Sequence, residues 1–163
     1  MKRRKREVPV VARENDMFEI TLSSDDRSTL LRFVDELSEI LAMGPDDARL
    51  RRLFPTAYHE NPEHDAEYQG YMRDELTQSR AASIAVVKEV LESTELITAG
   101  QLHAFMTVLN NLRLVLGTLL DVGEDDFEDD IDEDDPSFGQ WQLYGYLGWL
   151  LEWTISALSG EDN

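Results

Sequence analysis

The segment TAGQLHAFMTVLNNLRLVLGTLL, residues 98–120, carries the clearest helix signal of the chain. Thr98 followed by Gln101 forms a capping box, which marks a helix N-terminus. Behind it, apolar residues recur at intervals of 3, 4, 3, 4 and 3 and form a heptad seam. The seam consists of Leu102, Phe105, Leu109, Leu112, Leu116 and Leu119. Further apolar residues widen this surface beyond one seam, so the helix is predicted to lie at the centre of a bundle.

Three further helices are predicted along the chain. The first begins at a Ser24 N-cap and ends at Gly44-Pro45. A long helix then runs from Asn61-Pro62 to about Glu92, because asparagine caps a helix and proline suits its first turn. The last helix is predicted for LYGYLGWLLEWTISAL, residues 143–158, which is apolar almost all round. Such a helix lies in the middle of a bundle or carries a second contact surface for a partner or another subunit.

Before the first helix, two short apolar stretches flank the turn-prone pair Asn15-Asp16. Residues 8–11 are rich in valine, and apolar and polar residues alternate over residues 18–22, which is typical of strands. An isolated pair of strands is only marginally stable, so the hairpin is expected to lie on helices. The sequence therefore predicts a mainly α protein, a four- to five-helix bundle with a small N-terminal β-hairpin, in which residues 8–160 form a single helical domain.

Charge is distributed unevenly along the 163 residues, whose formal net charge is −19. Residues 2–6 are KRRKR, and residues 1–7 are predicted to form a disordered basic arm. Ten of the twelve residues from Glu124 to Asp135 are acidic, and their mutual repulsion predicts a mobile acidic loop at residues 123–137. Because carboxylates repel phosphate, basic partners are favoured over nucleic acid, with the Lys2–Arg6 arm as the exception.

The chain contains no cysteine, which excludes disulfides, a thiolate nucleophile and Cys-ligated zinc. The basic cluster at residues 2–6 is not followed by an apolar run of the length that a signal peptide needs. The apolar segment 143–158 has sixteen residues with Glu152 near its middle, below the ~18 expected of a membrane-spanning helix. A cytoplasmic protein without membrane association is therefore expected.

One segment, HENPEH at residues 59–64, comes close to a zinc-protease motif. That motif places two histidines four residues apart on one helix, whereas His59 and His64 are five apart and Pro62 lies between them. A metal-dependent hydrolase-like site near His59 and His64 stays an alternative, as does DNA binding through Lys2–Arg6. Since no nucleophile, cofactor or metal motif is recognisable, no catalytic, cofactor-binding or metal residue is predicted, and the chain is expected not to be an enzyme.

Aromatic residues of the last helix are the predicted contact residues for a protein partner. They are Trp141, Tyr144, Trp149 and Trp153. Gly145 and Gly148 interrupt this helix, and because glycine is unfavourable there, they indicate close approach of another backbone or a shallow groove. Arg113, the single basic residue inside an apolar helix, is the fifth candidate; the simpler interpretation of Arg113 is an ion pair with Asp74 or Glu75.

Three parts of the sequence together resemble a known family. They are LFPTAY (residues 53–58) with MRDEL (72–76), LNNLRLVLGTLLDV (109–122) and LYGYLGWLLEWTISAL (143–158). The family is an actinobacterial domain of unknown function whose members are typically encoded beside the gene for ClpS, the adaptor of the Clp protease. Some members carry the name AosR, an oxidative-stress transcriptional regulator.

The resemblance implies a cytoplasmic regulator or adaptor in the transcriptional stress response that acts through protein contacts. A sigma factor or a Clp-related protein is the implied partner, and a homodimer is a further option. One property of a redox regulator does not transfer to this sequence: sensing of oxidants through paired cysteines is excluded, because the chain has none.

Overall fold

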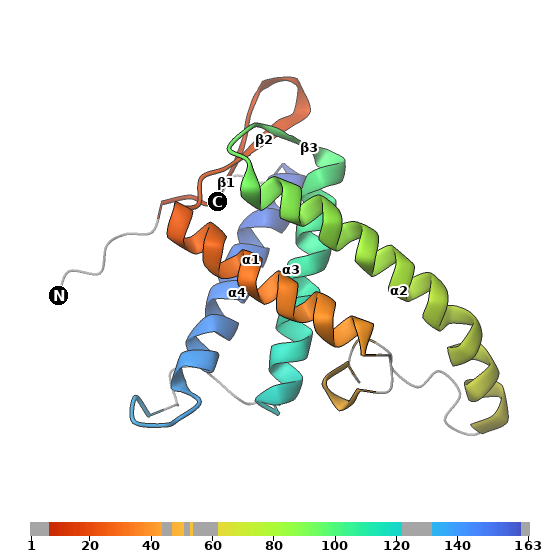
Figure 1. Cartoon of the computed structure of the whole chain (residues 1–163). Helices are drawn as coiled ribbons and strands as arrows, with labels where there is room; N and C mark the ends of the chain where they lie inside the picture. The colour runs from red at the N-terminus through yellow and green to blue at the C-terminus, as the bar shows by residue number, and fades with distance from the viewer. Residues whose placement is uncertain (1–6, 44–46, 51–52, 54–61, 122–131, 161–163) are drawn as a thin grey trace.

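The computed structural model of the chain describes residues 7–43, 47–50, 53, 62–121 and 132–160. Within the long helix α2, side chains are described only for Glu63, Glu67 and the residues from Glu75 onward. The described residues contain four α-helices, three short strands and two 3-10 turns (Figure 1). In chain order these are β1 (Val10–Ala12), η1 (Glu14–Asp16), β2 (Met17–Ile20), α1 (Ser24–Ala42), η2 (Ala48–Leu50), α2 (Pro62–Glu92), β3 (Ile97–Thr98), α3 (Ala99–Leu119) and α4 (Phe138–Ser159). The prediction of a mainly α protein with an N-terminal hairpin is confirmed.

Helix α3 begins as its sequence predicts and lies at the centre of the structure. The Thr98 hydroxyl accepts a hydrogen bond from the Gln101 N–H (3.2 Å), and the Gln101 side chain accepts one from the Thr98 N–H (2.8 Å). α3 packs against α1, α2 and α4, so its apolar residues are covered from several sides. The heptad prediction is wrong at its last position: Leu119 is 53% exposed, whereas the other five seam residues are buried.

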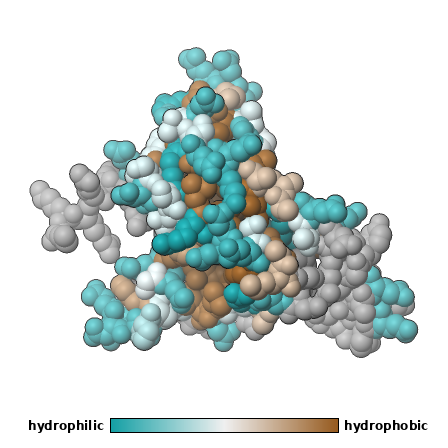
Figure 2. Space-filling model, viewed as in Figure 1, coloured by the Kyte–Doolittle hydropathy of each residue, from teal (hydrophilic) through white to brown (hydrophobic). Residues whose placement is uncertain are grey.

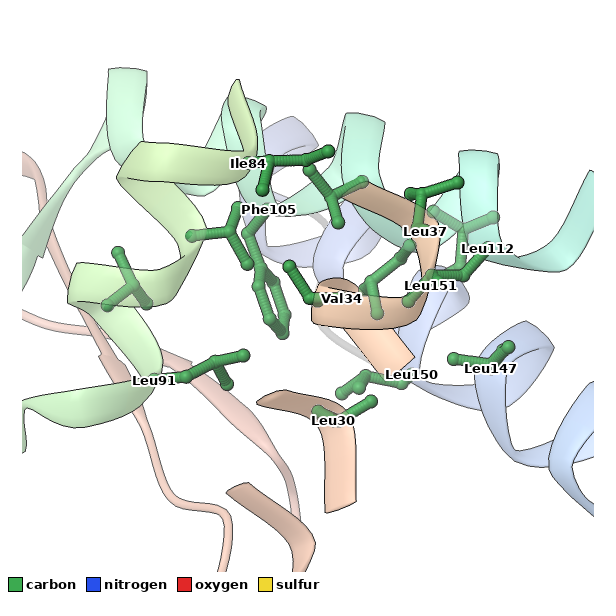
Figure 3. Close-up of a cluster of buried hydrophobic side chains, with 14 of the residues drawn as sticks. Leu30, Val34, Leu37, Ile84, Leu91, Phe105, Leu112, Leu147, Leu150 and Leu151 are labelled. Atoms are coloured by element: carbon green, nitrogen blue, oxygen red, sulfur yellow. The ribbon is translucent and has the colours of Figure 1, made fainter. Parts of the chain in front are cut away.

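Side chains from all four helices meet in one hydrophobic core that includes Phe105 of α3 (Figure 3). Its other labelled members are Leu30, Val34 and Leu37 of α1, Ile84 and Leu91 of α2, Leu112 of α3, and Leu147, Leu150 and Leu151 of α4. Burial of each such side chain stabilises the fold by about 1.5–3 kcal/mol. These contacts join segments that are far apart in the sequence and hold the helices around α3.

Helix boundaries agree with the sequence at α2 and differ at α1 and α4. α2 starts at Pro62 and ends at Glu92, as predicted. Ser23 rather than Ser24 caps α1, because the cap hydroxyl must lie three residues before its donor, here the Asp26 N–H at 3.1 Å. α4 begins at Phe138, ahead of the predicted apolar segment.

A third strand joins the predicted hairpin. β1 and β2 pair antiparallel with Val10 opposite Ile20, and β2 pairs antiparallel with β3, Phe18 lying opposite Ile97. β3 has two residues and ends at the α3 cap, so no alternating pattern in the sequence could reveal it. It fixes the sheet to the start of α3, which is how the hairpin comes to lie on the helices.

Two predicted segments fall largely outside the described residues. These are the basic arm, of which residues 1–6 are not described, and the acidic loop, of which residues 122–131 are not described. At the described end of that loop, Asp132, Glu133, Asp134 and Asp135 are exposed. No helix in the described part of the chain is long and apolar enough to cross a membrane.

One buried cation, Arg27, joins the sheet to two helices. Arg27 lies in the first turn of α1 and is 8% exposed. Its guanidinium donates hydrogen bonds to five backbone carbonyl oxygens. These acceptors belong to Ile20 (2.6 Å), Leu22 (3.1 Å), Val90 (3.2 Å), Leu91 (3.4 Å) and Ser93 (2.6 Å). Burial lowers the pKa of Arg27, but a guanidinium stays charged, so the carbonyls take the place of a carboxylate partner.

We expect Arg27→Ala to lower the free energy of unfolding by about 3 kcal/mol, because buried carbonyls lose a charged donor. In Arg27→Lys the ammonium group makes fewer of these hydrogen bonds than the guanidinium, so we expect a free energy of unfolding between those of wild type and Arg27→Ala. Arg13→Ala is the matched control: it removes an exposed ion pair with Glu19 and changes stability by less than about 1 kcal/mol. Urea unfolding followed by circular dichroism measures all three, and a wild-type midpoint for Arg27→Ala contradicts the structural role of Arg27.

Candidate functional site

A cavity of about 540 Å³ lies between α1, α3 and the start of α4, open on one side; we call it the groove. Its lining residues are Thr29, Arg32, Phe33, Glu36, Leu37 and Ile40 from α1, Leu112, Val115, Leu116 and Leu119 from α3, and Pro136, Gly139, Gln140, Leu143 and Leu147 from the α4 side. Most of these side chains are aliphatic or aromatic. The groove is therefore an apolar surface, of a size that ligand and partner sites commonly have.

The helix sequences explain why this surface is apolar. On α1, Phe33, Leu37 and Ile40 recur at spacings of 4 and 3 and share one face. Leu119 lies at the end of α3, where that helix stops, and this leaves its side chain half exposed. In Figure 2 apolar residues gather below the hydrophilic surface of α1, in the region where α3 and α4 diverge in Figure 1.

Exposed carboxylates lie in the lining of the groove and in the segment that leads into it; we call the following five the acidic rim. They are Glu36, Asp132, Glu133, Asp134 and Asp135. Glu36 lines the groove itself, and the other four immediately precede the lining residue Pro136. The Ser137 hydroxyl (2.6 Å) and backbone N–H (2.8 Å) donate to Asp135 and hold the pKa of that carboxyl below its usual value. Arg32, which lies over the Phe33 ring, is the basic residue among the lining side chains.

A separate cluster forms where Arg113 of α3 meets α4. The Arg113 guanidinium carbon lies 4.9 Å from the centre of the Tyr144 ring. A Cβ added to Gly148 would lie 3.5 Å from Arg113 Nε, an ordinary van der Waals distance, so the arginine side chain passes directly beside this glycine. Trp141 packs edge-on against Tyr144, with ring centres 6.1 Å apart. The neighbour of Gly148 is therefore a side chain, whereas the glycines in this helix suggested close approach of a backbone.

Arg113 stacks on Tyr144, and the expected ion pair with Glu75 is not formed. Glu75 is exposed on α2 and makes no ion pair with Arg113, while the side chain of Asp74 lies outside the described residues. The Arg113 Nε is buried without a hydrogen-bond partner. A flat guanidinium can be stabilised by an aromatic face instead of a carboxylate, which the sequence pattern did not indicate.

The structure divides the predicted contact residues into two groups. Trp141 and Tyr144 join Arg113, and Trp141 is only 7% exposed. Trp149 instead packs against Tyr146, with ring centres 5.7 Å apart, and both are half-buried at the edge of the core. Trp153 is half-buried as well. Tyr144 and Trp149 are five residues apart, which turns them to different sides of the helix.

The alternative sites fall outside the described residues or lack described side chains. Lys2–Arg6 and His59 are not described, and for His64 only the backbone, in α2, is described. Among the residues that are described, no group of three or more His, Asp or Glu side chains converges as metal ligands would. Neither alternative gains support from the geometry.

Sequence reasoning missed the groove and Arg27, for different reasons. The groove arises from the crossing of three helices, which no pattern within one helix encodes. Arg27 did leave a signal: together with Leu30, Val34, Leu37 and Leu41 it follows spacings of 3, 4, 3 and 4 on the buried face of α1. A cation in such a series indicates a buried, fully bonded group.

Comparison with known families gives one result. The model of a protein family described as a domain of unknown function, DUF2017, matches residues 4–158. The chain belongs to the DUF2017 family. No curated protein and no solved structure matches the sequence. The part of the resemblance that placed the chain in a domain family of unknown function is therefore confirmed, and the DUF2017 match includes all four helices, the groove and the Arg113 cluster.

In this DUF2017 protein we expect Arg113→Ala to lower the free energy of unfolding by about 1 kcal/mol, through loss of the contact with Tyr144. A double-mutant cycle with Tyr144→Leu isolates that contact, and a coupling energy of about 0.5–1 kcal/mol is expected. Denaturant unfolding of the four proteins measures it. Strictly additive effects would show that the stacking of Arg113 on Tyr144 contributes nothing to stability.

Proposed function

We propose that the protein is a non-enzymatic regulatory or adaptor protein that acts through protein–protein contacts, with the groove as its principal contact surface. The observation that carries this proposal is the open apolar cavity between α1, α3 and α4. Apolar surface gathered in a concave site and bordered by charged residues is typical of surfaces that bind another molecule. Leu119, half exposed at the end of α3, is an apolar side chain that a partner would cover.

The half-buried aromatic residues of α4 support a protein partner. Trp149, Trp153 and Tyr146 expose part of their rings on a side of α4 that does not line the groove. Tryptophan and tyrosine are enriched at the energetic centres of protein interfaces, because they combine large apolar area with few rotatable bonds. A partner large enough to extend beyond the groove would contact this second surface.

The more specific part of the proposal rests on the resemblance stated above. On that basis we propose that the protein acts in the cytoplasm of an actinobacterium, in the transcriptional stress response, with a sigma factor or a Clp-related protein as its partner. The charge of the chain is compatible with a protein that acts through a protein partner, since a net charge of −19 favours partners with basic surfaces. The signal is not a thiol oxidation, because the chain has no cysteine.

Gly139→Trp tests the proposal with little risk to the fold. A Cβ at Gly139 would meet no atom within 4 Å, and the residue lines the groove, so a tryptophan there fills space that a partner would use. Gln142→Trp is the matched control, three residues further along α4 at an exposed position that does not line the groove. Both variants should melt within about 2 °C of the wild type.

The measurement is affinity capture from an actinobacterial lysate under oxidative stress, read by quantitative mass spectrometry. We expect at least one protein that wild type and Gln142→Trp retain equally and that Gly139→Trp loses by roughly tenfold or more. If every captured protein is retained equally by both variants, the groove is not the contact surface and the proposal is overturned.

A further inference from the structure

We infer that the occupant of the groove is a basic amphipathic helix of about three turns, supplied by a partner protein. This inference rests on the proposed function and specifies the partner's chemistry. It joins three observations: the length of the groove, its apolar lining and the carboxylates that border it.

The length of the groove sets the length of the occupant. Its α1 wall runs from Thr29 to Ile40, which at 1.5 Å per residue is about 16 Å, or three helical turns. The cavity between α1, α3 and the start of α4 is open on one side, and a further helix could lay its apolar side chains into it there. Recognition of this kind uses apolar anchors at positions i, i+3, i+4 and i+7 of the bound helix.

The charge around the groove sets the sign of the occupant. The acidic rim places one exposed carboxylate, that of Glu36, on the α1 wall, where it offsets the charge of Arg32, and four more immediately before the α4 wall. From Leu114 onward the sequence has fourteen acidic residues and no Lys or Arg, so the α4 wall carries no competing cation. Lysine and arginine residues on the outer side of a docked helix would meet this rim, and the attraction would also speed the encounter.

The same charge argues against a second copy of this chain as the occupant. Two molecules that each carry a net charge of −19 repel each other, and any symmetric contact through the groove would bring two acidic rims together. An acidic partner is disfavoured for the same reason. A small apolar ligand would fill the floor of the groove without using the rim.

The probe is a fluorescein-labelled peptide of about 14 residues, with leucine at positions i, i+3, i+4 and i+7 and lysine at most others. Fluorescence anisotropy measures its binding to the full chain. We expect saturable binding that Gly139→Trp weakens by roughly tenfold and Gln142→Trp leaves unchanged. A permuted peptide of the same composition, which cannot form an apolar stripe, should bind at least about tenfold more weakly, as should the same helix with glutamate in place of lysine.

Neutralising carboxylates of the acidic rim tests whether these charges contribute to binding of the basic peptide. Asp132→Asn/Glu133→Gln/Asp134→Asn should weaken the basic peptide several-fold and reduce the loss of affinity between about 50 and 300 mM salt. The Asp134 N–H donates a hydrogen bond to the Asp132 side chain (3.1 Å), and an asparagine oxygen can still accept that bond, so the local turn is retained. Glu89→Gln/Glu92→Gln/Glu95→Gln is the control: it removes the same charge from exposed sites that do not border the groove.

Each outcome decides between occupants. Binding of the basic peptide that Gly139→Trp does not affect overturns the inference, since attraction to carboxylates alone then explains it. Equal binding of the lysine and glutamate peptides overturns the role of the rim, and a groove-dependent dimer in analytical ultracentrifugation replaces the partner helix by a second copy. A lysate partner lost in Gly139→Trp, together with failure of the peptide, rejects this inference and leaves the proposed function standing. Peptide binding without such a lysate partner shows that the groove accepts a basic helix, but it overturns the proposed function and with it the claim that a partner protein supplies that helix.

Discussion

The structure depends on the burial of one helix that is apolar on more than one face. α3 cannot be covered by a single neighbour, so α1, α2 and α4 each pack against a different part of it. In Figure 1, α1 crosses α3 and α4 rather than running along them. A crossing helix covers its neighbours only locally, and beyond the crossing the apolar surfaces of α3 and α4 continue. The groove includes the part of the α3 surface that the described helices leave open.

Arg27 fixes where α1 starts and therefore where it crosses. A cation in the first turn of a helix is unfavourable, because that end of the helix dipole is positive. Here the guanidinium reaches the carbonyls of Val90 and Leu91 in the last turn of α2, which form the negative end of a second dipole. It also binds the carbonyl of Ile20 at the end of β2. One side chain thus joins α1 to the end of β2 and to the last turn of α2.

The sequence predicted those features that depend on interactions between residues close together in the chain. The Thr98–Gln101 capping box, the span of α2 and the hairpin turn at Asn15-Asp16 all follow from interactions between residues close in sequence, and all three are confirmed. Two local boundaries differ, the cap of α1 by one residue and the start of α4 by five, and the larger failures are tertiary. Arg113 stacks on the ring of Tyr144 because α4 passes beside it, and no pattern within α3 reveals which side chain of another helix it meets. The groove required the relative placement of three helices, and no single-helix periodicity contains that information.

The apolar lining of the groove and the acidic rim beside it have to be considered together. An apolar groove on a neutral protein would promote self-association, since the simplest way to cover it is a second copy. A large net charge opposes that contact over the Debye length of ~8 Å at physiological ionic strength, while an oppositely charged partner is attracted over the same range. The carboxylates near Pro136 therefore do two things at once: they keep copies of the chain apart and they select a basic helix. The apolar lining alone would promote self-association, and the acidic rim alone would not bind an apolar helix face. Together they favour a basic amphipathic helix over a second copy of the chain.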